Sequence, residues 1–127
     1  MIVLDASALL ALVDREVGWD LVAAAASADD VTMSAVNYAE VLQKARRRGV
    51  ATEAVDTLLD ALDFTVTPFG RLDARLAASF YRHGSGLALA DRVCLALARS
   101  LSSSAYTADR AWLRWAADFG VDVTVIR

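Results

Sequence analysis

The chain has 127 residues, of which 57% are hydrophobic and 23% are charged, and its formal net charge is −3. This length predicts a single domain over residues 1–127, and the low counts of Pro and Gly exclude a disordered chain. One cysteine and one histidine exclude a disulfide framework and a structural zinc site. Because no segment has the pattern of a signal peptide or a membrane span, we expect a cytoplasmic protein with no membrane partner.

Short β-branched runs alternate along the chain with longer segments of helical periodicity. The predicted strands are 2–5, 31–34, 64–67, 105–107 and 121–126. The predicted helices are 6–13, 18–28, 35–48, 52–62, 70–82, 89–102 and 109–119, with Ser34 and Thr52 as N-caps. This alternation is typical of βαβ units and predicts a three-layer α/β/α fold around a five-stranded parallel sheet.

Acidic residues follow two of the predicted strands. Asp5 ends the first strand, and Asp109 follows the fourth by two residues. Functional groups of open parallel sheets collect at the carboxyl ends of the strands, so both are candidates for a site. The alternative is that each acid only caps the helix that follows it.

Asp91 lies on the inward face of the predicted helix 89–102. The residues that share this face are Cys94, Leu95, Ala98 and Leu101. An unpaired carboxylate on that face costs several kcal/mol, so something must compensate its charge. Asp109 aligns in the same way with Trp112 and Ala116. Glu40 stands four residues before Lys44, which suits a solvent-exposed ion pair, yet its helix starts beside the sheet edge that also holds Asp5.

If these four carboxylates converge, their repulsion must be cancelled by protonation or by a cation. Oxygen ligands without nearby His or Cys favour Mg²⁺ or Mn²⁺ over zinc or copper. Such a site supports hydrolysis of phosphodiester bonds.

The four acids lie in the segments IVLDASALL (2–10), SAVNYAEV (34–41), GLALADRVCLALA (86–98) and YTAD (106–109). In order and spacing these segments resemble the motifs of the PIN domain, and more narrowly those of VapC-type toxins of bacterial toxin–antitoxin pairs. The resemblance extends over essentially the whole chain.

The resemblance implies a metal-dependent endoribonuclease with RNA as its substrate, usually a homodimer, held inactive by a cognate VapB-type antitoxin. By motif, the acidic quartet of the family falls on catalytic and metal-binding residues Asp5, Glu40, Asp91 and Asp109. The supporting hydroxyl falls on Ser7, and Thr107 has a plausible water-orienting role.

Other residues receive weaker assignments. Arg92 and Arg110 each adjoin a proposed ligand and are candidate substrate contacts. The helix that holds Trp19 and the alanine run 23–26 is a candidate antitoxin groove. His83 is expected in a solvated loop, and Cys94 is expected to be a small core residue rather than a nucleophile.

Two alternative functions compete with the nuclease. A phosphoacceptor or phosphatase domain also places an Asp at a strand end, but Ser7 replaces the second Asp of a DxD loop, and the only lysine, Lys44, lies in a mid-chain helix. A non-catalytic metal-binding interaction module with the same fold stays open, because only an assay separates it from an enzyme.

Overall fold

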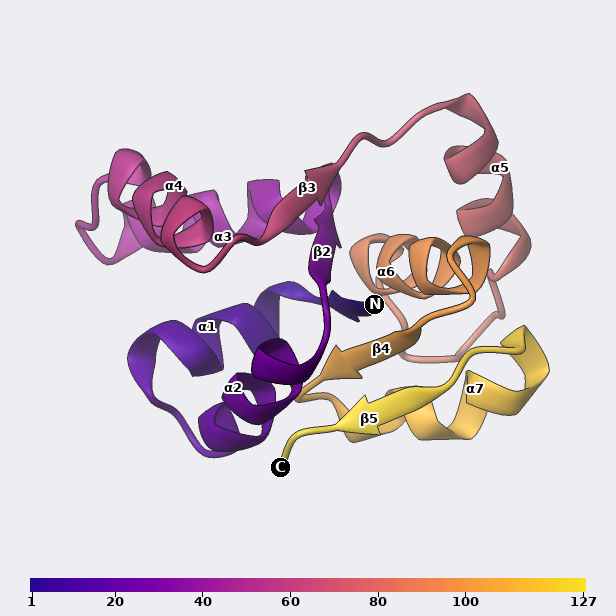
Figure 1. Ribbon diagram of the computed structural model, residues 1–127. Coiled ribbons are helices and arrows are strands. Elements are labelled where there is room, and N and C mark those ends of the chain that lie inside the picture. The colour runs from indigo at the N-terminus through magenta and orange to yellow at the C-terminus, as the bar shows by residue number, and fades with distance from the viewer.

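The β-branched segments form one sheet of five parallel strands (Figure 1). The computed structural model describes residues 1–127, and its strands are β1 (Ile2–Leu4), β2 (Val31–Ser34), β3 (Thr65–Thr67), β4 (Ser104–Thr107) and β5 (Val123–Val125). The order across the sheet is β3-β2-β1-β4-β5, so that Ile2 in the central strand pairs with Val31 on one side and Ser104 on the other. The predicted sheet is confirmed.

Helices cover both faces of the sheet. They are α1 (Ala6–Asp14), α2 (Trp19–Ala28), α3 (Ala35–Arg47), α4 (Thr52–Ala61), α5 (Arg71–Ser79), α6 (Leu89–Ser100), the 3₁₀ helix η1 (Arg110–Trp112) and α7 (Leu113–Phe119). Figure 1 shows α1 to α4 toward the left of the view and α5 to α7 toward the right. The α/β/α layering therefore matches the prediction. None of these helices is both long and apolar enough to cross a membrane.

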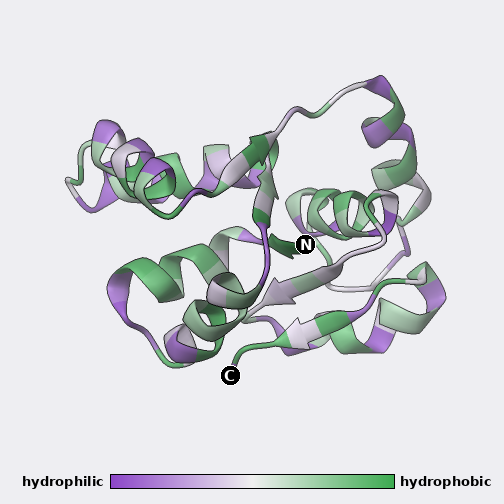
Figure 2. Ribbon diagram, viewed as in Figure 1, coloured by the Kyte–Doolittle hydropathy of each residue, from purple (hydrophilic) through white to green (hydrophobic).

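Two hydrophobic clusters lie on the two faces of the sheet. In β1, Ile2 and Leu4 pack into one cluster and Val3 into the other, as expected from the alternation of side chains along a strand. The first cluster is completed largely by α1, which is green over most of its length in Figure 2. In α6 every residue from Val93 to Ala98 is buried, because this helix packs against the sheet and also against α3 and α5.

The order in which the chain adds strands to the sheet indicates where a ligand-binding crevice is expected. From the central β1 the chain runs outward through β2 to β3, and it then returns to the other side of β1 to add β4 and β5. The carboxyl ends of β1 and β4 therefore lie at the point where the strand order reverses, which is the usual binding crevice of an open α/β sheet.

Two local predictions were wrong. The segment predicted as one helix over 109–119 is the short η1 followed by α7. Ser34 does cap α3, but Ala51 rather than Thr52 is the N-cap residue of α4.

Candidate active site

A hollow of about 400 Å³ opens at the carboxyl edge of the sheet. Its lining residues are Asp5, Ala6, Ser7, Glu40, Lys44, Asp91, Ala108, Asp109 and Arg127. The structure thus brings the four acids of the sequence analysis to one place, although they come from four separate parts of the chain. Only two of the nine lining residues are hydrophobic, so the hollow is polar rather than a pocket for an apolar ligand.

Asp5 is the most buried of the four acids, with 6% of its surface exposed. It is the N-cap of α1, and its Oδ1 accepts hydrogen bonds from Ser7 Oγ at 2.7 Å and from the Ala8 amide at 2.8 Å. Its Oδ2 accepts from Thr107 Oγ1 at 2.6 Å. Burial raises the pKa of Asp5, and the three donors offset only part of that rise. The capping role and the site role therefore belong to the same carboxylate.

Two hydroxyl groups tie the ends of β1 and β4 together. Ser7 Oγ, which donates to Asp5, also accepts from the Ala108 amide at 2.9 Å. Thr107 is fully buried, and its Oγ1 accepts from the Asp109 amide at 3.1 Å. These bridges fix the turn that precedes Asp109 relative to Asp5.

Asp91 is half-buried on the first turn of α6, where its Oδ2 accepts from the Ala88 amide at 2.8 Å. Burial, together with the charges of Asp5, Asp109 and Glu40, raises the pKa of Asp91 to about 6, although the Ala88 hydrogen bond acts in the opposite direction. A carboxylate with this pKa lies among other carboxylates without enough positive charge to offset them.

Glu40 accepts a hydrogen bond from Asn37, which lies one turn earlier on α3. Asn37 is 1% exposed, and its Nδ2 donates to Glu40 Oε2 at 3.2 Å and to the Ala90 carbonyl at 3.1 Å. One amide therefore joins Glu40 to the residue before Asp91. The Asn37 Oδ1 is buried and accepts no hydrogen bond. The sequence assigned no role to Asn37, and a lone amide among apolar residues was the only signal for it.

Asp109 is exposed rather than inward-facing, which corrects the prediction from helical periodicity. Its Oδ1 accepts from the Ala111 amide at 2.9 Å, so that Asp109 is the N-cap of η1. Asp109 has an extended backbone, with φ −94° and ψ 110°, and it precedes η1, so the helical periodicity that aligned it with Trp112 does not include it. It still borders the hollow.

The cations near the hollow differ from those that the sequence suggested. Lys44 and Arg127 line it, whereas Arg92 and Arg110 do not. Arg127 pairs with Glu16 at 3.2 Å, and Lys44 makes no ion pair. The Arg92 guanidinium lies 5.2 Å from the centre of the Tyr81 ring, and its Nε is buried without a partner.

The donor set fits a hard divalent cation. Asp91, Glu40 and Asp109 each keep one carboxylate oxygen that accepts no hydrogen bond from the protein, and no His or Cys lines the hollow. As the side chains stand, no group of three or more His, Cys, Asp or Glu residues is arranged to hold a metal ion. Ligation by more than two of these acids therefore needs side-chain rotations toward the ion.

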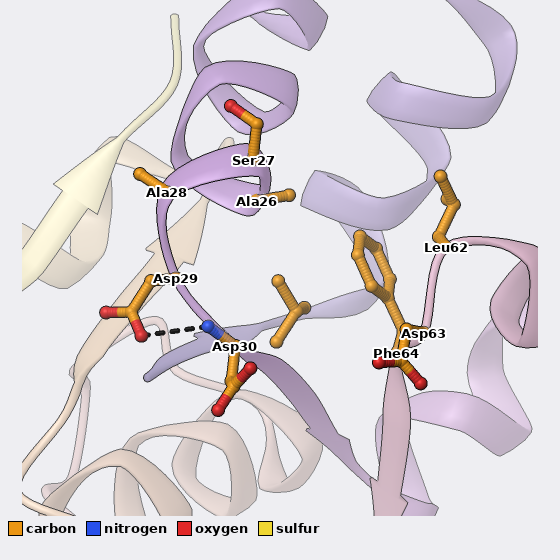
Figure 3. A pocket seen from close by; sticks show the side chains of 9 residues that line it. Ala26, Ser27, Ala28, Asp29, Asp30, Leu62, Asp63 and Phe64 are labelled. Carbon is orange, nitrogen blue, oxygen red and sulfur yellow. Dashed lines mark hydrogen bonds between the residues drawn. The ribbon is translucent and has the colours of Figure 1, made fainter.

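A second hollow, of about 430 Å³, opens at the opposite edge, near the amino ends of β2 and β3 (Figure 3). Its lining residues are Ala26, Ser27, Ala28, Asp29, Asp30, Val31, Leu62, Asp63 and Phe64. Figure 3 shows Asp29 accepting a hydrogen bond from the Asp30 amide at 2.8 Å. Asp29 also pairs with the N-terminal amine at 2.7 Å. These acids are exposed, and none of the predicted site residues lies here.

The residues set aside in the sequence lie where they were expected. His83 is exposed in the loop after α5. Cys94 is fully buried, and burial raises the pKa of its thiol well above the ordinary value. A thiol in that environment is a core side chain and not a nucleophile.

Comparison with known proteins gives a consistent result. Residues 2–117 match the PIN domain family. A structure described as FitAB bound to an IR36 DNA fragment matches with 23% identity and a TM-score of 0.73, over 98% of this chain and 94% of that chain. FitAcB from Neisseria gonorrhoeae matches with 23% identity and a TM-score of 0.69, over 97% and 96%. A toxin–antitoxin complex from Klebsiella pneumoniae matches with 19% identity and a TM-score of 0.65, over 86% and 87%. No curated protein sequence matches significantly. At these identities the structural matches show a shared fold.

Proposed function

Because the chain belongs to the PIN domain family, we propose that it is a Mg²⁺- or Mn²⁺-dependent endoribonuclease, the toxin of a VapBC-type toxin–antitoxin pair. One observation supports the catalytic part of this proposal above all others. Four acids from separate segments border one polar hollow at the carboxyl edge of the sheet, and three of them raise the pKa of the fourth. Such a cluster attracts a divalent cation, and it offers no favourable contacts to an apolar or anionic ligand.

Each residue of the hollow has a separate task in this proposal. Asp5 and Asp91 are the principal ligands, with Glu40 and Asp109 binding directly or through water. Ser7 and Thr107 orient Asp5 and favour its ionised form, since their hydroxyls donate to its two oxygens. The ion, when bound, supplies Lewis acidity toward the phosphodiester and the attacking water.

The proposed partners follow from the family resemblance and from the structural matches. Two of the matched structures are described as a toxin–antitoxin complex and as FitAB with DNA, so a VapB-type antitoxin is the partner to search for. We propose a homodimer as the toxin assembly. Size-exclusion chromatography with light scattering, with and without a co-expressed antitoxin, tests both expectations.

The decisive experiment compares RNA cleavage by the wild type and by Asp91→Asn in Mg²⁺, in Mn²⁺ and in EDTA. We expect cleavage by the wild type only, and only with a metal. Asp60→Asn is the matched control, because Asp60 is exposed on α4 and does not line the hollow. Equal cleavage by wild type and Asp91→Asn, or cleavage that EDTA leaves unchanged, contradicts the mechanism.

The alternative is a metal-binding interaction module without catalysis. This alternative predicts that the wild-type protein is folded and binds Mg²⁺ or Mn²⁺ in calorimetry, but cleaves no RNA. The same calorimetric titration of Asp91→Asn then shows whether the hollow is the binding site.

A further inference from the structure

Lys44 is the only lysine of the chain, and it lies at the acidic hollow. It follows Glu40 by one turn on α3, and its side chain is half-buried. The sequence suggested an ordinary surface pair between the two residues, since Glu followed by Lys four positions later is the favourable orientation for a helical ion pair.

The structure shows a different arrangement. Glu40 accepts a hydrogen bond from the buried Asn37, and Lys44 forms no ion pair and no side-chain hydrogen bond with any residue. The other cation at the hollow, Arg127, is engaged by Glu16 and by the Val17 carbonyl. Lys44 is therefore the lining cation whose charge no acid neutralises.

A polyanionic substrate needs a free cation at this position. Four carboxylates repel a phosphate group that approaches the hollow, and Lys44 is the cation among the lining residues that makes no ion pair. An ammonium is a compact charge with three donors, which suits the non-bridging oxygens of a phosphate without regard to the base.

We infer that Lys44 binds a backbone phosphate of the RNA at the mouth of the hollow. This inference rests on the proposed nuclease function. Lys44 contributes affinity for the strand and gives no preference for its sequence, because it contacts the backbone alone. It is a substrate-binding residue and not a ligand of the metal.

The test measures RNA binding with Lys44→Gln and with Arg46→Gln, both in the Asp91→Asn background to prevent cleavage. Arg46 is the matched control, because it lies on the same helix, is exposed, and does not line the hollow. By fluorescence anisotropy we expect Lys44→Gln to weaken binding of single-stranded RNA about 3- to 10-fold and to make the slope of log K against log salt shallower by about 0.7. Arg46→Gln is expected to change the Kd less than 2-fold, as is Lys44→Arg.

Steady-state kinetics in the wild-type background provides an independent measurement. Lys44→Gln is expected to raise KM with a much smaller effect on kcat, and Mg²⁺ affinity by calorimetry is expected to stay the same. Thermal unfolding of each variant verifies that it is folded.

The possible failures are distinguishable. If Asp91→Asn abolishes cleavage while Lys44→Gln and Arg46→Gln have equal effects on Kd, salt slope and KM, the inference about Lys44 is wrong and the nuclease stands. If Lys44→Gln changes Mg²⁺ affinity and leaves the RNA Kd unchanged, Lys44 is a counter-ion of the carboxylates. If Asp91→Asn cleaves as the wild type does, the proposed function itself fails.

Discussion

Asp91 combines two roles that oppose each other in the metal-free protein. It caps α6 through the Ala88 amide, and burial, together with the charges of three other acids, raises its pKa to about 6 from an ordinary 3.8. Between these two values the folded protein binds more protons than the unfolded chain. The free energy of unfolding therefore falls as the pH rises through this interval, so that the contribution of protonated Asp91 is present below pH 4 and lost above pH 6.

We expect Asp91→Asn to stabilise the metal-free protein at pH 7. The amide keeps an oxygen for the Ala88 hydrogen bond and removes the charge; because the side chain is only half-buried, solvent screening limits the gain to about 1 kcal/mol. Urea unfolding in EDTA at pH 4.5 and pH 7 measures the difference in the free energy of unfolding between Asp91→Asn and the wild type. A variant less stable than the wild type at pH 7 contradicts this explanation.

Asn37 places a buried polar group between two elements of the site. We expect Asn37→Ala to lower the free energy of unfolding by about 2 kcal/mol, because it removes a buried side chain together with its hydrogen bonds to Glu40 and to the Ala90 carbonyl. Freed from Asn37, Glu40 should also bind Mg²⁺ less well. Urea unfolding and calorimetric Mg²⁺ titration measure the two effects, with Gln43→Ala on the exposed side of α3 as the control. Unchanged stability and Mg²⁺ affinity would show that the bridge is incidental.

At the scale of elements, β1 and β4 are joined by side chains as well as by the strand ladder. Thr107 Oγ1 is the donor that lowers the pKa of Asp5 most, and it also accepts from the Asp109 amide. The end of β4 is therefore fixed against the start of α1 by groups that serve the site.

Thr107→Val keeps the shape of the side chain and removes both hydrogen bonds. We expect a loss of about 2 kcal/mol at pH 7, since the side chain loses a hydrogen bond to a buried carboxylate. The loss should be smaller near pH 4, because the pKa of Asp5 rises further and protonation relieves the charge. Urea unfolding at both pH values measures this, and Thr124→Val, half-buried in β5, is the control. A loss that is equal at both pH values contradicts the role of Asp5.

The elements that the sequence predicted well are those with long periodic patterns. All five strands and the helices between them were found, because buried parallel strands and amphipathic helices have distinct periods. The start of the last helix was missed, since η1 forms where Asp109 caps a tight turn instead of a full α-helical one.

At the site itself the acids were predictable, and the groups that support them were not. Asp5 and Asp91 stand out locally, one at a strand end and one on an apolar helix face. The role of Asn37 depends on a contact between segments some 50 residues apart. The role of Lys44 depends on the absence of an ion pair. Neither produces a local pattern in the sequence.

Considered as a whole molecule, the protein concentrates its negative charge. Four of its 16 acidic residues and two of its 13 basic residues line the hollow, so that 12 acidic and 11 basic residues lie elsewhere. The remainder of the molecule is close to neutral, so the acidity of the protein reflects the proposed site.

Divalent cations should therefore stabilise the folded molecule. An ion that binds only the folded state adds about 2.7 kcal/mol at a concentration of 100 Kd, so Mg²⁺ or Mn²⁺ is expected to raise the Tm of the wild type by several degrees and that of Asp91→Asn by less. The effect should be weaker at pH 5, where protons compete for Asp91. Differential scanning fluorimetry at matched ionic strength measures it; equal shifts with NaCl, or equal shifts in both proteins, would argue against binding at the hollow.

The place of β1 in the middle of the sheet also sets an order of events during synthesis. Ile2–Leu4 is made first, yet one of its two neighbours is Ser104–Thr107, so the central strand waits for most of the chain before its pairing is complete. At roughly 5–20 residues per second this delay is several seconds or more. Asp5 and Glu40 are synthesised several seconds before Asp91 and Asp109. The acidic hollow therefore forms only when translation has passed residue 109.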